Sequence, residues 1–156
     1  MKFIVDSNVG RLARWLRIAG FDTMSINDLD DNRLVRLALS EGRVLLTKDT
    51  QILKRRVATT GRLKVILIES EEVKAQLRQV VKALNLGDKI KPFTLCLECN
   101  QPLVLSEKED VKELVPPYIS QTQTQYMQCP ACQRVYWRGT HWQRMSRELE
   151  RIVSEL

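Results

Sequence analysis

The sequence has no apolar run long enough to span a membrane, and its amino terminus has no hydrophobic stretch of the length of a signal peptide. It also has no internal repeat and no low-complexity tract. These absences argue against a membrane-embedded, secreted or repeat protein, and we expect a cytoplasmic chain. Its 156 residues suffice for one ordinary core, or for a core plus a small module whose folding a metal supports.

The carboxyl-terminal part of the chain has no excess of positive charge. Residues 92–156 contain 7 Lys and Arg against 8 Asp and Glu, whereas residues 1–91 contain 18 against 11. The formal charge of +6 therefore comes from the amino-terminal part. A basic surface is typical of proteins that bind nucleic acid or another polyanion, although a modest excess also serves solubility.

No cysteine lies outside two short motifs, Cys96-Leu97-Glu98-Cys99 and Cys129-Pro130-Ala131-Cys132, which are separated by 29 residues. The two-residue gap lets both sulfurs of a motif face one ion, and four thiolates suit tetrahedral zinc. Two disulfides in a secreted protein are the alternative, which the absence of a signal peptide disfavours. Because four protein ligands leave no open coordination position, the expected Zn²⁺ is structural.

Short β-rich runs alternate with helical patterns in the first 90 residues. We expect strands over residues 2–6, 21–26, 43–47 and 63–68, and helices over residues 8–19, 31–42, 50–58 and 71–86. This alternation predicts an α/β fold with a doubly wound, mainly parallel sheet and helices on both of its faces.

The pattern ends at residues 87–92, which we interpret as a domain boundary. Residues 1–91 then form the sheet domain, and residues 92–156 form a Cys₄ zinc ribbon with a terminal helix. The polar segment 106–128 between the two cysteine motifs predicts a long loop or finger, and the spacing of apolar residues predicts a helix over 142–153.

Three aspartates lie where parallel strands would bring them to one edge of the sheet. Asp6 closes the first strand, Asp49 follows the third, and Asp31 opens the helix after the second. Carboxylates gathered in this way repel one another unless a cation lies among them, and hard oxygen ligands suit Mg²⁺ or Mn²⁺. The alternative is three separate structural roles, as helix caps and a turn residue.

Basic and polar residues flank these acids, and such residues are suited to gripping a phosphate backbone. The residues that we expect to contact substrate are Asn8, Arg11, Arg14, Arg17, Thr47 and Lys48. A solvated helix face is the alternative for the arginines, and a cap and a buried hydroxyl are the alternatives for Asn8 and Thr47.

The motifs Val5-Asp6-Ser7-Asn8-Val9 and Leu45-Leu46-Thr47-Lys48-Asp49 resemble the signatures of PIN-domain nucleases. With the two cysteine motifs and the segment Tyr136-Trp137-Arg138-Gly139-Thr140-His141-Trp142, nearly the whole chain is similar to the Mut-seven C-terminal ribonuclease domain family. That family has a compact PIN-like domain followed by a zinc ribbon. The resemblance implies a metal-dependent ribonuclease, a hydrolase with RNA as substrate, with Asp6, Asp31 and Asp49 at the positions of PIN acids.

The chain departs from the PIN pattern in its number of acids. Typical PIN domains have a further acid on a helix between the first and third of these positions and another soon after the position of Asp49, where this chain has Gln51. This difference keeps a second hypothesis open, in which a PIN-like scaffold binds RNA or a protein partner without cutting.

Aromatic and basic residues surround the second cysteine motif. Tyr126, Tyr136, Trp137 and Trp142 could stack on unpaired bases, with arginines alongside, or could pack the ribbon against the sheet domain. The lone histidine, His141, is either a general base or a structural residue.

Overall fold

The computed structural model describes residues 1–156, and its amino-terminal part is built on a four-stranded parallel sheet in the order β2-β1-β3-β4. The strands are β1 (Lys2–Val5), β2 (Asp22–Ser25), β3 (Val44–Thr47) and β4 (Val65–Leu67). Phe3 of the central β1 is paired with Thr23 on one side and Val44 on the other, which fixes the register. The predicted parallel sheet is confirmed.

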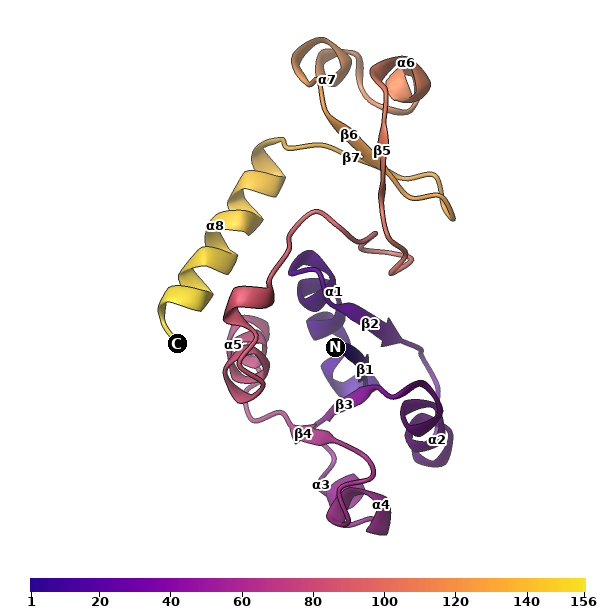
Figure 1. The fold of residues 1–156 in the computed structure, drawn as a ribbon, viewed down its shortest axis with the longest axis vertical. Helices are drawn as coiled ribbons and strands as arrows, with labels where there is room; N and C mark the ends of the chain where they lie inside the picture. Colours follow the sequence, from indigo (N-terminus) through magenta and orange to yellow (C-terminus); the bar gives the residue numbers. More distant parts are fainter.

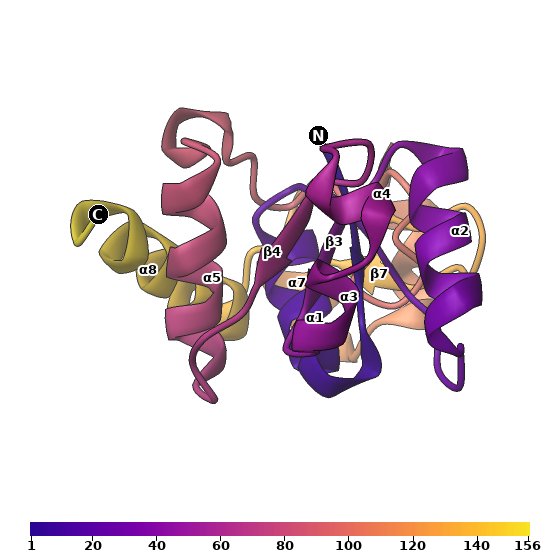
Figure 2. The same ribbon diagram turned by 90° about the horizontal axis from the view of Figure 1, so that it is seen from below.

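Helices cover both faces of this sheet, also as predicted (Figure 2). Successive residues of a strand point to opposite faces, so Phe3 and Val5 enter one hydrophobic cluster and Ile4 enters the other. The first and larger cluster is covered by α1 (Gly10–Ile18), α5 (Val73–Ala83) and α8 (Thr140–Ser154). The second cluster is covered by α2 (Asp31–Glu41) and α3 (Thr50–Leu53).

Gly20 follows α1 at a point where the segment around Lys91 passes close to the backbone. Its φ of +94° favours glycine, and a Cβ at this position would collide with the carbonyl of Lys91. The Lys91 amide donates a 2.9 Å hydrogen bond to the Ala19 carbonyl. The segment that leaves the sheet domain after η2 (Gly87–Lys89) is therefore fixed against the end of α1.

The carboxyl-terminal part contains an antiparallel sheet of β5 (Val104–Ser106), β6 (Tyr126–Gln128) and β7 (Val135–Tyr136), in that order. We call residues 94–137, which include this sheet and the four cysteines, the ribbon.

The segment 106–128, which we predicted to be a long loop or finger, connects β5 to β6, but it is not an irregular loop. This segment folds into α6 (Lys108–Val111), η3 (Lys112–Leu114) and α7 (Pro117–Thr122). The physical reason is a small hydrophobic cluster of Val111, Val115, Ile119 and Tyr126, which come from α6, the break between η3 and α7, α7 itself and β6. These few apolar residues are hidden among Gln, Glu and Thr in the sequence.

The predicted single helix over residues 50–58 is two short helices, α3 and α4 (Arg56–Thr59). Arg55 takes an extended conformation between them, with φ −66° and ψ 146°. Its guanidinium donates a 2.8 Å hydrogen bond to the Asn32 side chain, which ties this break to the start of α2.

The terminal helix α8 returns from the ribbon to the sheet domain and packs beside α5 (Figure 1). Leu149 and Ile152 belong to the larger hydrophobic cluster, and ion pairs join Lys74 to Glu148 at 3.1 Å and Arg78 to Glu155 at 2.8 Å. The hydrophobic core thus extends across the predicted boundary at residues 91 and 92, and the division into two domains stays a prediction. None of the helices combines the length and the hydropathy that crossing a membrane requires.

Candidate functional site

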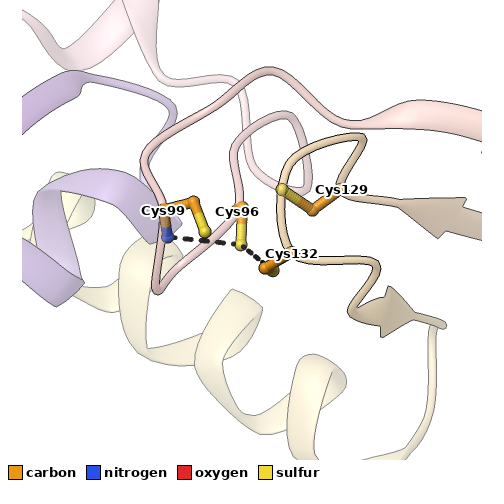
Figure 3. Close-up of side chains that lie close together, drawn as sticks. All are labelled: Cys96, Cys99, Cys129 and Cys132. Carbon is orange, nitrogen blue, oxygen red and sulfur yellow. Dashed lines mark hydrogen bonds between the residues drawn. The ribbon is translucent and has the colours of Figure 1, made fainter.

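The two cysteine motifs meet in space, with their sulfurs facing one another from two tight turns (Figure 3). All four Sγ atoms lie within 4.8 Å of one another, and those of Cys96 and Cys132 are 3.7 Å apart. Zn–S bonds of about 2.3 Å in a regular tetrahedron imply S–S separations of about 3.8 Å. The four cysteines therefore could hold zinc, and the geometry fits the donor set.

Hydrogen bonds prepare Cys96 for this role. Its Sγ accepts from the Cys99 amide at 3.4 Å and lies 3.2 Å from the Tyr136 hydroxyl. Burial alone would raise the pKa of Cys96, but these hydrogen bonds outweigh it and lower the pKa to about 7. The neighbouring thiol of Cys132, followed by burial, raises the pKa of Cys99 to about 12. Four thiols this close cannot all lose their protons without a cation among them.

The first cysteine motif is docked on the edge strand β2. Asn100 accepts a 2.9 Å hydrogen bond from the Thr23 amide and donates a 2.6 Å hydrogen bond to Asp22. The buried Arg43 pairs with the same Asp22 carboxylate at 2.8 Å. Partial burial would raise the pKa of Asp22, yet the hydrogen bonds from Arg43 and Asn100 and the guanidinium charge lower it. The ribbon is thus held to the sheet domain by specific polar contacts.

At the carboxyl ends of β1 and β3, Asp6 and Asp49 are joined through one buried hydroxyl. Thr47 donates a 2.7 Å hydrogen bond to Asp6 Oδ2, and its Oγ1 accepts from the Asp49 amide at 3.0 Å. The two carboxylates also accept from backbone amides, Asp6 from Ser7 at 2.8 Å and Asp49 from Gln51 at 2.8 Å. Asp6 and Asp49 therefore act as caps of the helical turns that follow them, which was the alternative to a metal site. Both acids nevertheless lie at the same edge of the sheet.

Asp31 completes this group, which we call the aspartate rim (Asp6, Asp31 and Asp49). The carboxylate of Asp30, not that of Asp31, caps α2 by accepting from the Arg33 amide at 2.8 Å. Partial burial, then a hydrogen-bonding contact with Asp49 and the charges of Asp49 and Asp6, raise the pKa of Asp31. The rim is looser than the cysteine cluster, because only the cysteines bring three or more ligand atoms within 4.8 Å of one another.

The residues predicted to contact substrate fall into two places. At the rim, Asn8 accepts a 3.3 Å hydrogen bond from the Lys48 amide, and the Lys48 ammonium pairs with Glu71. Arg14 and Arg17 instead face the first cysteine motif.

These two arginines contact the ribbon directly. Arg14 pairs with Glu98 at 3.0 Å, with both side chains about half exposed. Arg17 donates 3.0 and 2.8 Å hydrogen bonds to the carbonyls of Thr23 and Leu97. Arg17 is thus a junction residue, whereas Arg11 is exposed on α1 with no ion-pair partner. Substrate binding by all of these residues stays a prediction.

Glu71 is an acid near the rim that sequence reasoning missed. It stands just before α5, pairs with Lys48, and lines a hollow with Ser7, Asn8 and Arg11. The available signal was its place after the fourth parallel strand, at the same carboxyl edge of the sheet that gathers the aspartates.

The aromatic side chains that follow the second cysteine motif are partly buried, whereas the histidine is exposed. Trp142 packs edge-on against Phe93, with ring centroids 5.5 Å apart, and the Arg138 guanidinium lies 5.0 Å above the Trp142 ring. Trp137 packs on the small ribbon cluster, and the exposed His141 lines a hollow beside it at the start of α8. No contact links His141 to the aspartate rim.

The protein is thus an α/β protein in which a four-stranded parallel sheet is combined with an antiparallel ribbon that contains a four-cysteine cluster. The family model described as the Mut7-C RNAse domain matches residues 1–149 of this chain. The chain therefore belongs to that family, which confirms the predicted resemblance, and the family points to a ribonuclease-like role and to interaction with RNA. No curated protein and no solved structure matches the chain.

Proposed function

We propose that this protein is a metal-dependent ribonuclease that hydrolyses RNA phosphodiesters at the aspartate rim. Asp6, Asp31 and Asp49 would hold Mg²⁺ or Mn²⁺, and the ribbon would assist in binding the substrate. The observation that carries the proposal is the buried Thr47 hydroxyl, which donates to the Asp6 carboxylate at 2.7 Å and accepts from the Asp49 amide at 3.0 Å, so that two of the three acids are joined at one edge of the sheet.

A divalent cation is the natural complement of this arrangement. Carboxylates gathered at one edge of the sheet repel one another when all are ionised, so the rim favours either a retained proton or a bound cation. A cation bound there supplies Lewis-acid polarisation of a phosphate and lowers the pKa of an attacking water. Thr47 fixes the carboxylate of Asp6, and Lys48, paired with Glu71, adds positive charge at the same edge.

The test compares cleavage of labelled single-stranded RNA by the natural protein and by Asp6→Asn, each with Mn²⁺. Asn keeps the size of the side chain and an acceptor for the Ser7 amide, so the fold should survive. We expect loss of one metal-binding carboxylate to reduce the rate by at least about 10²-fold. The matched control is Asp88→Asn, which changes an exposed acid in η2 and should cleave like the natural protein. Equal cleavage by all three proteins would refute the proposal.

A non-catalytic RNA- or protein-binding module is the second candidate. The looseness of the rim, which brings no three carboxylates within 4.8 Å, favours it. In that case salt-dependent RNA binding would survive Asp6→Asn, and no divalent cation would produce cleavage.

A further inference from the structure

A groove runs between α1 and the ribbon, beside the first cysteine motif. Residues from four segments line it, and they include Arg14, Glu98, Leu114, Arg134, Tyr136 and Trp137. Figure 1 shows α1 on the side of the sheet domain that faces the β5-β6-β7 sheet. The groove is therefore formed jointly by the two parts of the molecule, and neither part contains it alone.

The helix α1 connects this groove with the aspartate rim. It begins directly after Asp6 and η1 (Ser7–Val9), and Arg11 and Arg14, three residues apart, share its exposed side. The exposed Arg134 lines the same groove as Arg14. Three exposed guanidinium groups on α1 and in this groove are suited to the repeating negative charge of a nucleic-acid backbone.

Hydrogen bonds from the cysteine cluster fix the ribbon side of the groove, which includes Arg134 and Tyr136. The Arg134 carbonyl accepts a 2.9 Å hydrogen bond from the Cys129 amide, which fixes the turn that carries this arginine. The Tyr136 hydroxyl lies 3.2 Å from Cys96 Sγ and accepts from the Leu97 amide at 3.1 Å. Aromatic rings beside arginines are suited to unpaired bases, which expose their faces for stacking.

We infer that this groove binds the flank of a single-stranded RNA whose scissile phosphate lies at the aspartate rim. The inference rests on the proposed function and adds the strandedness and the minimum length of its substrate. Several unpaired nucleotides on one side of the cleavage point must extend from the rim along α1. On binding, Arg14 must leave Glu98 and pair with a phosphate of the RNA instead.

The test measures binding without cleavage. In the Asp6→Asn background, fluorescence anisotropy compares labelled single-stranded RNAs of about 4 and about 12 nucleotides, one at the lower end and one well within the usual range of single-strand binding sites. Arg134→Glu, a reversal of an exposed charge, should weaken binding of the longer RNA by about tenfold and leave the shorter one unchanged. Arg62→Glu is the matched control, because Arg62 is also exposed but precedes β4, the edge strand on the other side of the sheet from β2.

A second variant, Glu98→Gln, should strengthen binding of the longer RNA by about two- to threefold, since it removes the carboxylate that competes for Arg14. Misfolding cannot produce such a gain. Equal affinities for Arg134→Glu and Arg62→Glu, or equal losses on both RNAs, would overturn the inference and leave the groove to a protein partner. If the natural protein fails to cleave but these binding differences appear, the proposed function fails and the groove assignment stands.

Discussion

The protein has two clusters of candidate metal ligands, and they are built in opposite ways. The four cysteines come from two tight turns, lie within 4.8 Å of one another, and include one thiol whose pKa hydrogen bonds lower to about 7. The three aspartates come from the ends of separate elements, lie farther apart, and include one carboxyl whose pKa is raised. Four sulfurs this close together are suited to permanent zinc, whereas the more separated carboxylates are suited to an exchangeable cation and substrate.

Removal of zinc should produce the largest effect and would separate the two clusters most clearly. A structural zinc site contributes on the order of 10 kcal/mol to folding, and the ribbon has only a small hydrophobic cluster besides. With a chelator, or in Cys129→Ser, we expect the amides of β6 to lose protection from hydrogen exchange while those of β1 keep it. The natural protein should contain one zinc per chain, and re-added zinc should restore the protection. Unchanged protection of β6 in the metal-free protein would contradict this expectation.

Leu149→Ala tests whether the terminal helix belongs energetically to the sheet domain. Leu149 is 3% exposed in the larger cluster, so its truncation should lower the free energy of unfolding by about 2–5 kcal/mol. Urea denaturation followed by circular dichroism measures the loss. Leu105→Ala in the ribbon is the matched control, since its side chain is 72% exposed and should cost almost nothing. Similar small losses in both variants would show that α8 only rests on the sheet domain.

Asn100→Ala tests the coupling between the cysteine motif and β2. It leaves the Thr23 amide without a partner and should cost about 1–3 kcal/mol in the same urea experiment. Asn27→Ala, at an exposed position, is the control.

The acid side of the stability profile should change in the same variant. Because folding lowers the pKa of Asp22, its stabilisation is present above the unfolded pKa of about 3.9 and is lost as the pH falls through the folded value. Asn100→Ala removes one cause of that lowering, so stability should depend less on pH below the unfolded pKa of about 3.9. An unaltered acid profile would mean that Asn100 does not act on Asp22.

Asp31→Asn should have the smallest effect and the most specific one. Folding raises the pKa of Asp31, so the metal-free protein loses stability as the pH rises from the unfolded pKa of about 3.9 to the folded value. Removing this charge should raise the melting temperature by about 1–2 °C at neutral pH without metal. Added Mn²⁺ should stabilise the natural protein and Asp88→Asn but not Asp31→Asn, in thermal scans. Equal stabilisation of all three proteins would show that the rim does not bind the ion.

Several features were predictable because their causes are local. The cysteine spacing indicates a zinc site without knowledge of the fold, since each pair of ligands comes from one turn. The alternation of short strands and helices predicts the parallel sheet, because consecutive parallel strands require crossovers. The helices over residues 108–122 were missed because their cluster depends on four apolar residues, one of which, Tyr126, lies beyond the helices themselves.

The sequence by itself determined the cysteine motifs, the parallel sheet and the aspartates at the ends of its elements, because each depends on spacing along the chain. Only the tertiary structure decided that Arg14 and Arg17 face the ribbon, that Asn100 ties the first cysteine motif to β2, and that α8 completes the core. These contacts join residues about 70 or more positions apart, and no local pattern specifies such pairs. The cysteine cluster and the aspartate rim could each be predicted alone, but the groove between the ribbon and α1 exists only because the two parts pack together.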